Sequence, residues 1–163
     1  MDWKGRGVVT TFASTAVFLI VTLAATAAAK TFTGPSGWEH VDQSVPPGSS
    51  EKVDQWKQGS GDLQQSLIVL SDSAVSYNDI LDRIHKNVSD AKLHVTVDKD
   101  QTCDGKTSHM IELVYGPDIK RVKVDRLVVP DGSGSVQITY IRPEPEPFSD
   151  DVKTALNAYC GTT

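Results

Sequence analysis

The chain has 163 residues, and its 16 Lys and Arg residues against 21 Asp and Glu residues give it a formal net charge of −5. An acidic balance of this kind repels nucleic acids and anionic lipid headgroups, which excludes the classes of protein that bind such polyanions through overall charge. We therefore predict no nucleic-acid partner.

The first 29 residues have the pattern of a secretory signal peptide. Lys4 and Arg6 precede an apolar run at 8–25, and small residues follow in Ala-x-Ala triplets. We predict cleavage after Ala29, with cleavage after Ala27 as the second choice, and hence a secreted or periplasmic protein without stable membrane insertion. The alternative is a retained anchor, because the apolar run is just long enough to span a bilayer.

Residues 30–163 have the size of one domain with one continuous hydrophobic core. Removal of residues 1–29 takes away Asp2 and two basic residues, which leaves a net charge near −6. We predict a signal peptide at 1–29 and a single, monomeric α+β domain at 30–163.

Cys103 and Cys160 are the two cysteines of the chain. Because thiols pair in oxidising compartments, we predict a disulfide between them. It would hold the C-terminal helix against the start of a strand meander, and a loop of this length stabilises a fold by about 4 kcal/mol in the chain-entropy model. The alternative is two buried free thiols.

Short strands and turns are predicted for the polar segment 30–61, which is rich in Gly and Pro. One strand contains Trp38, and another, at 53–57, contains Trp56. Such tryptophans are commonly core lids, but they can also bind ligands, and we assign Trp38 and Trp56 as a candidate binding rim. The apolar run at 63–70 predicts a central strand that is covered on both faces.

Two helices are predicted. The first begins at Ser76, with Asp79 three residues later, and carries its apolar residues at helical spacing. The second begins at Ser149 after a stiff, proline-rich spacer at 142–147, and Gly161 ends it. Both should pack against the sheet through their apolar stripes.

Four consecutive strands are predicted between the helices, and the short turns between them favour an antiparallel meander. Within the third strand, the apolar residues switch from even-numbered positions (Val122, Val124) to odd-numbered positions (Leu127, Val129). This switch predicts a bulge near Asp125 and Arg126. The fold class is therefore α+β, an antiparallel sheet of six to seven strands with two helices. The four strands are expected at 93–97, 107–115, 119–129 and 136–140. The basic residues interpreted as the solvent face of the third strand are Lys120, Arg121, Lys123 and Arg126.

This layout resembles the PsbP-like fold, on the Gly37-Trp38 opening, the helix at 76–88, the turn glycine Gly105 before the meander, and the C-terminal helix. The fold is shared by the PsbP extrinsic subunit of photosystem II and a Ran-binding nuclear import factor, and secreted bacterial proteins of the LpqN and DcrB type are similar. The resemblance implies a non-enzymatic binding or assembly domain. The chain lacks the lipidated cysteine of the lipoprotein relatives, and no functional residue matches position by position.

The histidines show no metal-ligand spacing, and strand parity does not bring the two on neighbouring strands together, so we predict no metal site. The four are His40, His85, His94 and His109.

The segment from Asp98 to Asp104 spaces its oxygens like the start of an EF-hand loop, but it lacks the central glycine and the final glutamate. We interpret it as a solvated acidic turn, with weak Ca²⁺ binding as the alternative. Glu112 and Asp125 are candidates for a carboxylate pair across strands, although acids on a strand surface are ordinary. Since there is no G-x-S-x-G motif and no phosphate loop, we predict no catalytic residue and no cofactor.

We therefore expect an exported, non-catalytic domain that binds an unknown protein or envelope component through the sheet face or groove that its helices leave uncovered. The alternatives are a small extracytoplasmic enzyme, whose polar residues converge only in three dimensions, and a structural envelope protein. An apolar groove would favour binding, whereas convergent acids and histidines with perturbed pKa in a pocket would favour the enzyme.

Overall fold

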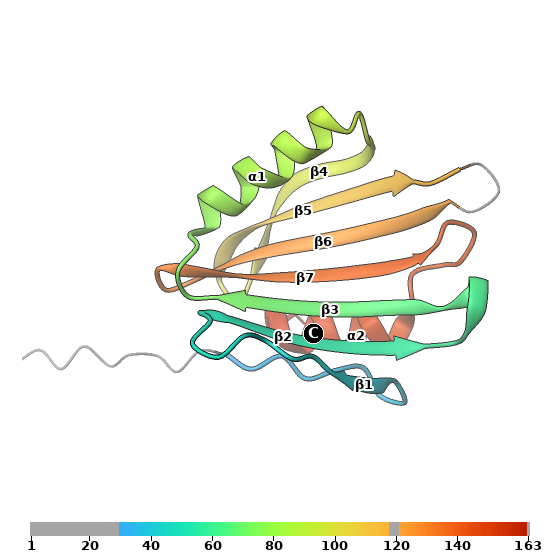
Figure 1. Ribbon diagram of the computed structural model, residues 1–163, viewed down its shortest axis with the longest axis horizontal. Helices are drawn as coiled ribbons and strands as arrows, with labels where there is room; N and C mark the ends of the chain where they lie inside the picture. The colour runs from blue at the N-terminus through green and yellow to red at the C-terminus, as the bar shows by residue number, and fades with distance from the viewer. Residues whose placement is uncertain (1–29, 118–120, 163) are drawn as a thin grey trace, which may run out of the picture.

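The computed structural model describes residues 30–117 and 121–162. They form an α+β fold, in which one antiparallel sheet of seven strands has the order β1-β2-β3-β7-β6-β5-β4 and carries two α-helices (Figure 1). The predicted signal peptide and its cleavage site lie outside the described residues. Within those residues, no helix is long and apolar enough to cross a membrane. The elements are β1 (Glu39–Asp42), β2 (Glu51–Gln58), a 3-10 turn (Gly61–Leu63), β3 (Gln65–Asp72), α1 (Tyr77–Asp90), β4 (His94–Cys103), β5 (Lys106–Tyr115), β6 (Val122–Asp131), β7 (Gly134–Pro143) and α2 (Asp150–Cys160).

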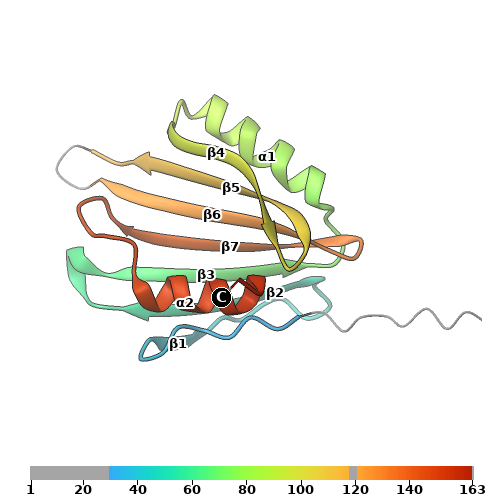
Figure 2. The same cartoon turned by 180° about the vertical axis from the view of Figure 1, so that it is seen from behind.

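The two helices cover opposite faces of the sheet, and Figure 2 shows α2 on the face that is turned away in Figure 1. In β6, Val124 and Val128 pack with the cluster under α1, whereas Leu127 and Val129 pack with the cluster under α2. We call these two sides of the sheet the α1 face and the α2 face. Because β6 keeps an unbroken register with both neighbours, the predicted bulge near Asp125 and Arg126 is wrong. The change in apolar parity instead reflects a strand with both faces buried.

The bulge lies in β4, at Thr96. Val95 is opposite Leu113 and Val97 is opposite Glu112, so Thr96 is an extra residue with no partner of its own. From Val97 onward, each side chain of β4 therefore lies on the face opposite to the one that it would occupy if Thr96 were paired regularly. The strand also continues to Cys103, so the predicted acidic turn from Asp98 to Asp104 is wrong except at its last residue.

The predicted disulfide is present. Cys103, at the end of β4, bonds to Cys160, the last residue of α2, and their Cα atoms are 4.3 Å apart. The backbone N–H of Asp104 donates to the Cys160 carbonyl at 2.9 Å, beside the bridge. Ser76 caps α1 as predicted, since its hydroxyl accepts from the Asp79 N–H at 3.2 Å. The bridge fixes α2 to the end of β4, and the cap sets the N-terminus of α1.

The α1 face is covered only in part. The strand β3 is interior, as predicted, with Leu67 and Val69 buried on the α2 face. On the α1 face, however, Ile68 and Leu70 remain partly exposed, so the prediction that both faces are covered is wrong. Figure 1 views this face, with α1 beside β4 and α2 behind the sheet. The α1 face over β1 to β3 thus presents half-exposed apolar side chains.

Candidate functional site

The two tryptophans of the predicted binding rim lie in the core of the α2 face. Trp38 is 8% exposed and Trp56 is 9% exposed. The Trp56 ring lies 5.7 Å from the Phe32 ring, and the Trp38 ring lies 6.1 Å from that of Tyr140, measured between centroids. Because both indoles are buried in this cluster, the assignment of Trp38 and Trp56 as a rim is corrected to a core role.

A groove of about 250 Å³ lies between α1 and the sheet, on the side of the helix that faces β7. Its walls are mostly apolar, and Tyr115, which is 42% exposed, borders it. We call it the α1 groove. The residues that line it are Ile84, Asn87, Val88, Leu93, Leu113, Tyr115, Val124, Arg126, Thr139 and Ile141.

Arg126 carries the charge in this groove. It was predicted on the solvent face of its strand, but it shares a face with Val124 and is partly buried. Its Nε donates to Thr139 Oγ1 at 3.2 Å. No carboxylate of residues 30–117 or 121–162 pairs with it. Burial lowers the pKa of the guanidinium, because a charge loses hydration in an apolar groove.

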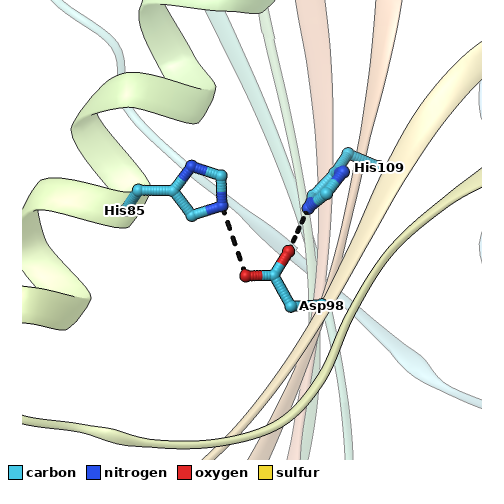
Figure 3. A group of neighbouring side chains, drawn as sticks. All are labelled: His85, Asp98 and His109. Atoms are coloured by element: carbon cyan, nitrogen blue, oxygen red, sulfur yellow. Dashed lines mark hydrogen bonds and ion pairs between the residues drawn. The ribbon is translucent and has the colours of Figure 1, made fainter.

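A second cluster lies on the other flank of α1, toward β4 (Figure 3). His85 comes from α1, Asp98 from β4 and His109 from β5. The Asp98 carboxylate lies between the rings, with Oδ1 2.6 Å from His109 Nε2 and Oδ2 3.5 Å from His85 Nε2. One ligand atom from each residue lies within 4.8 Å of the other two.

Asp100 completes this cluster from behind. Its Oδ1 lies 2.8 Å from His109 Nδ1, so both nitrogens of this ring have carboxylate partners. Burial by itself lowers the pKa of His109, but the hydrogen bonds and charges of Asp100 and Asp98 outweigh burial and raise the pKa. The side chain of His109 is 11% exposed, whereas those of His85 and Asp98 are 45% and 44% exposed.

The candidate carboxylate pair also forms. Glu112 and Asp125 are cross-strand partners, and Asp125 is buried. Burial raises the pKa of Asp125 to about 6 against the opposing charge of Arg142, whose Nη1 donates to Asp125 Oδ2 at 2.5 Å. Arg142 itself is enclosed by the rings of Tyr140 and Phe148, at 5.5 and 5.4 Å. These side chains do not line the α1 groove, and they form an internal ion-pair network.

A larger cavity, of about 500 Å³, lies near the 3-10 turn and the end of β7. Its lining includes Arg121 and Glu144, whose Nε and Oε2 atoms form an ion pair at 3.2 Å. This cavity therefore offers no free charged group with which to build a site.

Sequence reasoning missed both of the sites that the structure assembles. Strand parity relates His94 to His109 on the neighbouring strand, but the histidine that meets His109 is His85, which lies on α1. The only sequence signal for Arg126 was its place beside apolar residues of a strand that is buried on both faces. His94 is exposed and stands apart from the cluster.

Comparison with known proteins adds little. No protein-family model matches the chain, and no curated protein matches it significantly. Among solved structures, the chain is similar to a protein of unknown function, PA94 from Pseudomonas aeruginosa, at 9% identity and a TM-score of 0.47. The match covers 66% of this chain and 83% of the other. A likeness of this size carries no argument about function.

Proposed function

We propose that this chain is an exported, non-catalytic binding domain with a PsbP-like fold, and that the α1 groove binds an amphipathic anion, an envelope component with an apolar body and an acidic group. The observation that carries the proposal is Arg126, a partly buried guanidinium without a carboxylate partner in the described residues, on an apolar groove. The disulfide supports an extracytoplasmic location, since such bonds persist in oxidising compartments.

The charge of Arg126 calls for an anion. Buried charges in proteins are paired, because an isolated charge in an apolar setting is costly. Thr139 occupies only Nε, which leaves the two terminal amino groups free of partners among the described residues. A planar guanidinium binds carboxylate or phosphate oxygens in a two-pronged geometry, so an acidic ligand group would satisfy it.

The surroundings of Arg126 call for an apolar ligand body. The groove walls include Val88 and Leu93 on one side and Leu113 on the sheet. Across β7, Thr139 is opposite Ile68, so the groove leads onto the half-exposed apolar surface of β3. Transfer of an alkyl chain from water onto such a surface yields about 25 cal/mol per Å² buried. An acyl chain with an acidic head matches both features.

The test uses dodecanoate as the probe and an NMR titration of the purified, exported chain as the assay. We expect dodecanoate to shift the backbone signals of groove residues. Arg126→Gln should weaken this binding by roughly tenfold, the loss of one charge-assisted contact. The control Arg83→Gln, an exposed arginine on α1, should leave it unchanged.

Three results would overturn the proposal. They are the absence of dodecanoate binding, equal binding by Arg126→Gln and the unsubstituted chain, and equal binding of the uncharged probe dodecanol. In each case Arg126 would have no role in anion recognition, and a protein partner on the open half of the α1 face would become the better explanation.

A further inference from the structure

The second cluster, formed by His85, Asp98 and His109, has no part in the groove and lies on the opposite flank of α1. Its three residues come from a helix and two strands, and their ligand atoms still converge within 4.8 Å (Figure 3). Two imidazole nitrogens and a carboxylate oxygen form a donor set typical of a transition-metal site, and its three protein ligands leave a position open.

The position of Asp100 is the feature that distinguishes this cluster from scattered surface histidines. Metal-bound histidines generally donate the second ring N–H to a carboxylate, which fixes the tautomer and the ring orientation. His109 has this arrangement, because its Nδ1 contacts Asp100 at 2.8 Å while its Nε2 points at Asp98. The ring is nearly buried, so its orientation is set by the fold before any ion binds.

The distances suit a small cation. In a tetrahedral site with bonds of about 2.0–2.1 Å, ligand atoms lie about 3.3 Å from each other. The contacts from Asp98 oxygens to the Nε2 atoms of His109 and His85, at 2.6 and 3.5 Å, fall on either side of that spacing. His85 and Asp98 are both nearly half exposed, so modest rotations of these two side chains can open the cluster, and an ion can enter from solvent.

We propose that His85, Asp98 and His109 bind one Zn²⁺ or a closely similar ion, with a fourth position for water or a ligand, and that Asp100 orients His109. Zn²⁺ fits better than Ca²⁺ or Mg²⁺, because those ions prefer all-oxygen sites. The ion would connect α1 to the β4–β5 hairpin at the edge of the sheet. Such a link would stabilise the folded chain by an amount that grows with the logarithm of the free ion concentration above its Kd.

The experiment measures Zn²⁺ binding to the chelator-treated, full exported chain by isothermal titration calorimetry near neutral pH. We expect one Zn²⁺ per chain, with a rise in the thermal unfolding midpoint on addition of ZnCl₂. His85→Ala and Asp98→Asn should each weaken binding by roughly tenfold or more. Because His85 and Asp98 are exposed, both variants should fold, and unfolding curves recorded without metal verify this.

Two matched control variants distinguish binding at this site from nonspecific binding of Zn²⁺ by other histidines. His94→Ala removes an exposed histidine of the same strand as Asp98, and His40→Ala removes a histidine that lies 3.3 Å from a carboxylate oxygen of Asp54. Both should bind Zn²⁺ like the unsubstituted chain. Asp100→Asn should retain the stoichiometry but lose affinity by about tenfold, as expected for a residue that positions a ligand.

The NMR signals of the imidazole nitrogens provide a readout that does not depend on affinity. Zn²⁺ should shift Nε2 of His85 and His109 and leave His94 unchanged. The proposal is overturned if His85→Ala binds Zn²⁺ as tightly as the unsubstituted chain, if His40→Ala or His94→Ala loses the binding, or if no stoichiometric binding occurs. None of these outcomes bears on dodecanoate, so the two proposed sites fail independently.

Discussion

Removal of the Cys103–Cys160 disulfide should destabilise the domain by about 4 kcal/mol. The bonded residues are 57 apart in sequence, and the chain-entropy model assigns a cross-linked loop of that length about 4 kcal/mol of unfolded-state entropy at room temperature. Domains of this size are stable by about 5–15 kcal/mol in total, so the bond accounts for a large share. By the scaling of midpoint with domain size, the unfolding temperature should fall by roughly 10–20 °C.

The assay is urea unfolding followed by circular dichroism, for the oxidised chain and for the Cys103→Ala/Cys160→Ala variant. Cys103 is fully buried, so the substitution also removes packing atoms. Unfolding of the unsubstituted chain in a reducing agent separates the two effects, since reduction keeps both sulfurs and loses only the link. A loss below about 1 kcal/mol on reduction, or two titratable thiols in the denatured oxidised chain, would refute this reasoning.

Substitutions at two buried acids, Asp125 and Asp72, give two further predictions. Burial raises the pKa of Asp125 to about 6, so between pH 4 and 6 the folded chain holds more protons at this carboxyl than the unfolded chain does. The free energy of unfolding should therefore fall as pH rises through this window, by at most about 3 kcal/mol. Asp125→Asn should remove this pH dependence from the free energies obtained by urea unfolding. The Ala74 N–H and the Ser50 hydroxyl lower the pKa of Asp72, each donating to it at 2.8 Å, so its stabilisation is present above about pH 4 and lost as pH falls through its folded pKa. At neutral pH, Asp72→Ala should cost about 1–3 kcal/mol and Asp72→Asn less, because the amide oxygen still accepts; equal losses in the two variants would contradict this account.

Local sequence signals predicted most of the elements. The alternation at 107–115 and 136–140 marks β5 and β7, and the Ser76 cap and Gly161, which has a φ of 69°, mark helix ends. These features depend on neighbours in sequence, where spacing and capping chemistry are direct evidence. The same holds for the disulfide, which followed from the compartment and the number of cysteines.

The sites were not predictable in the same way, because each depends on contacts between elements that are distant in sequence. Arg126 was assigned to solvent because a strand is usually read with one buried face, whereas β6 buries both. His85 and His109 meet only once α1 crosses the sheet to the β4 edge. Trp38 and Trp56 were placed at a surface because nothing local shows that the segment from Phe32 onward packs over the α2 face.

The extra residue at Thr96 links two features that otherwise have nothing in common. In a regular strand, Asp98 would be opposite Met110, and Asp98, Asp100 and Cys103 would all exchange sides. The two acids would then turn away from the histidines, and the sulfur of Cys103 would turn away from the C-terminal helix. Regular pairing through Thr96, in place of the bulge, would therefore remove the proposed ion site and the covalent crosslink together, although it changes no residue.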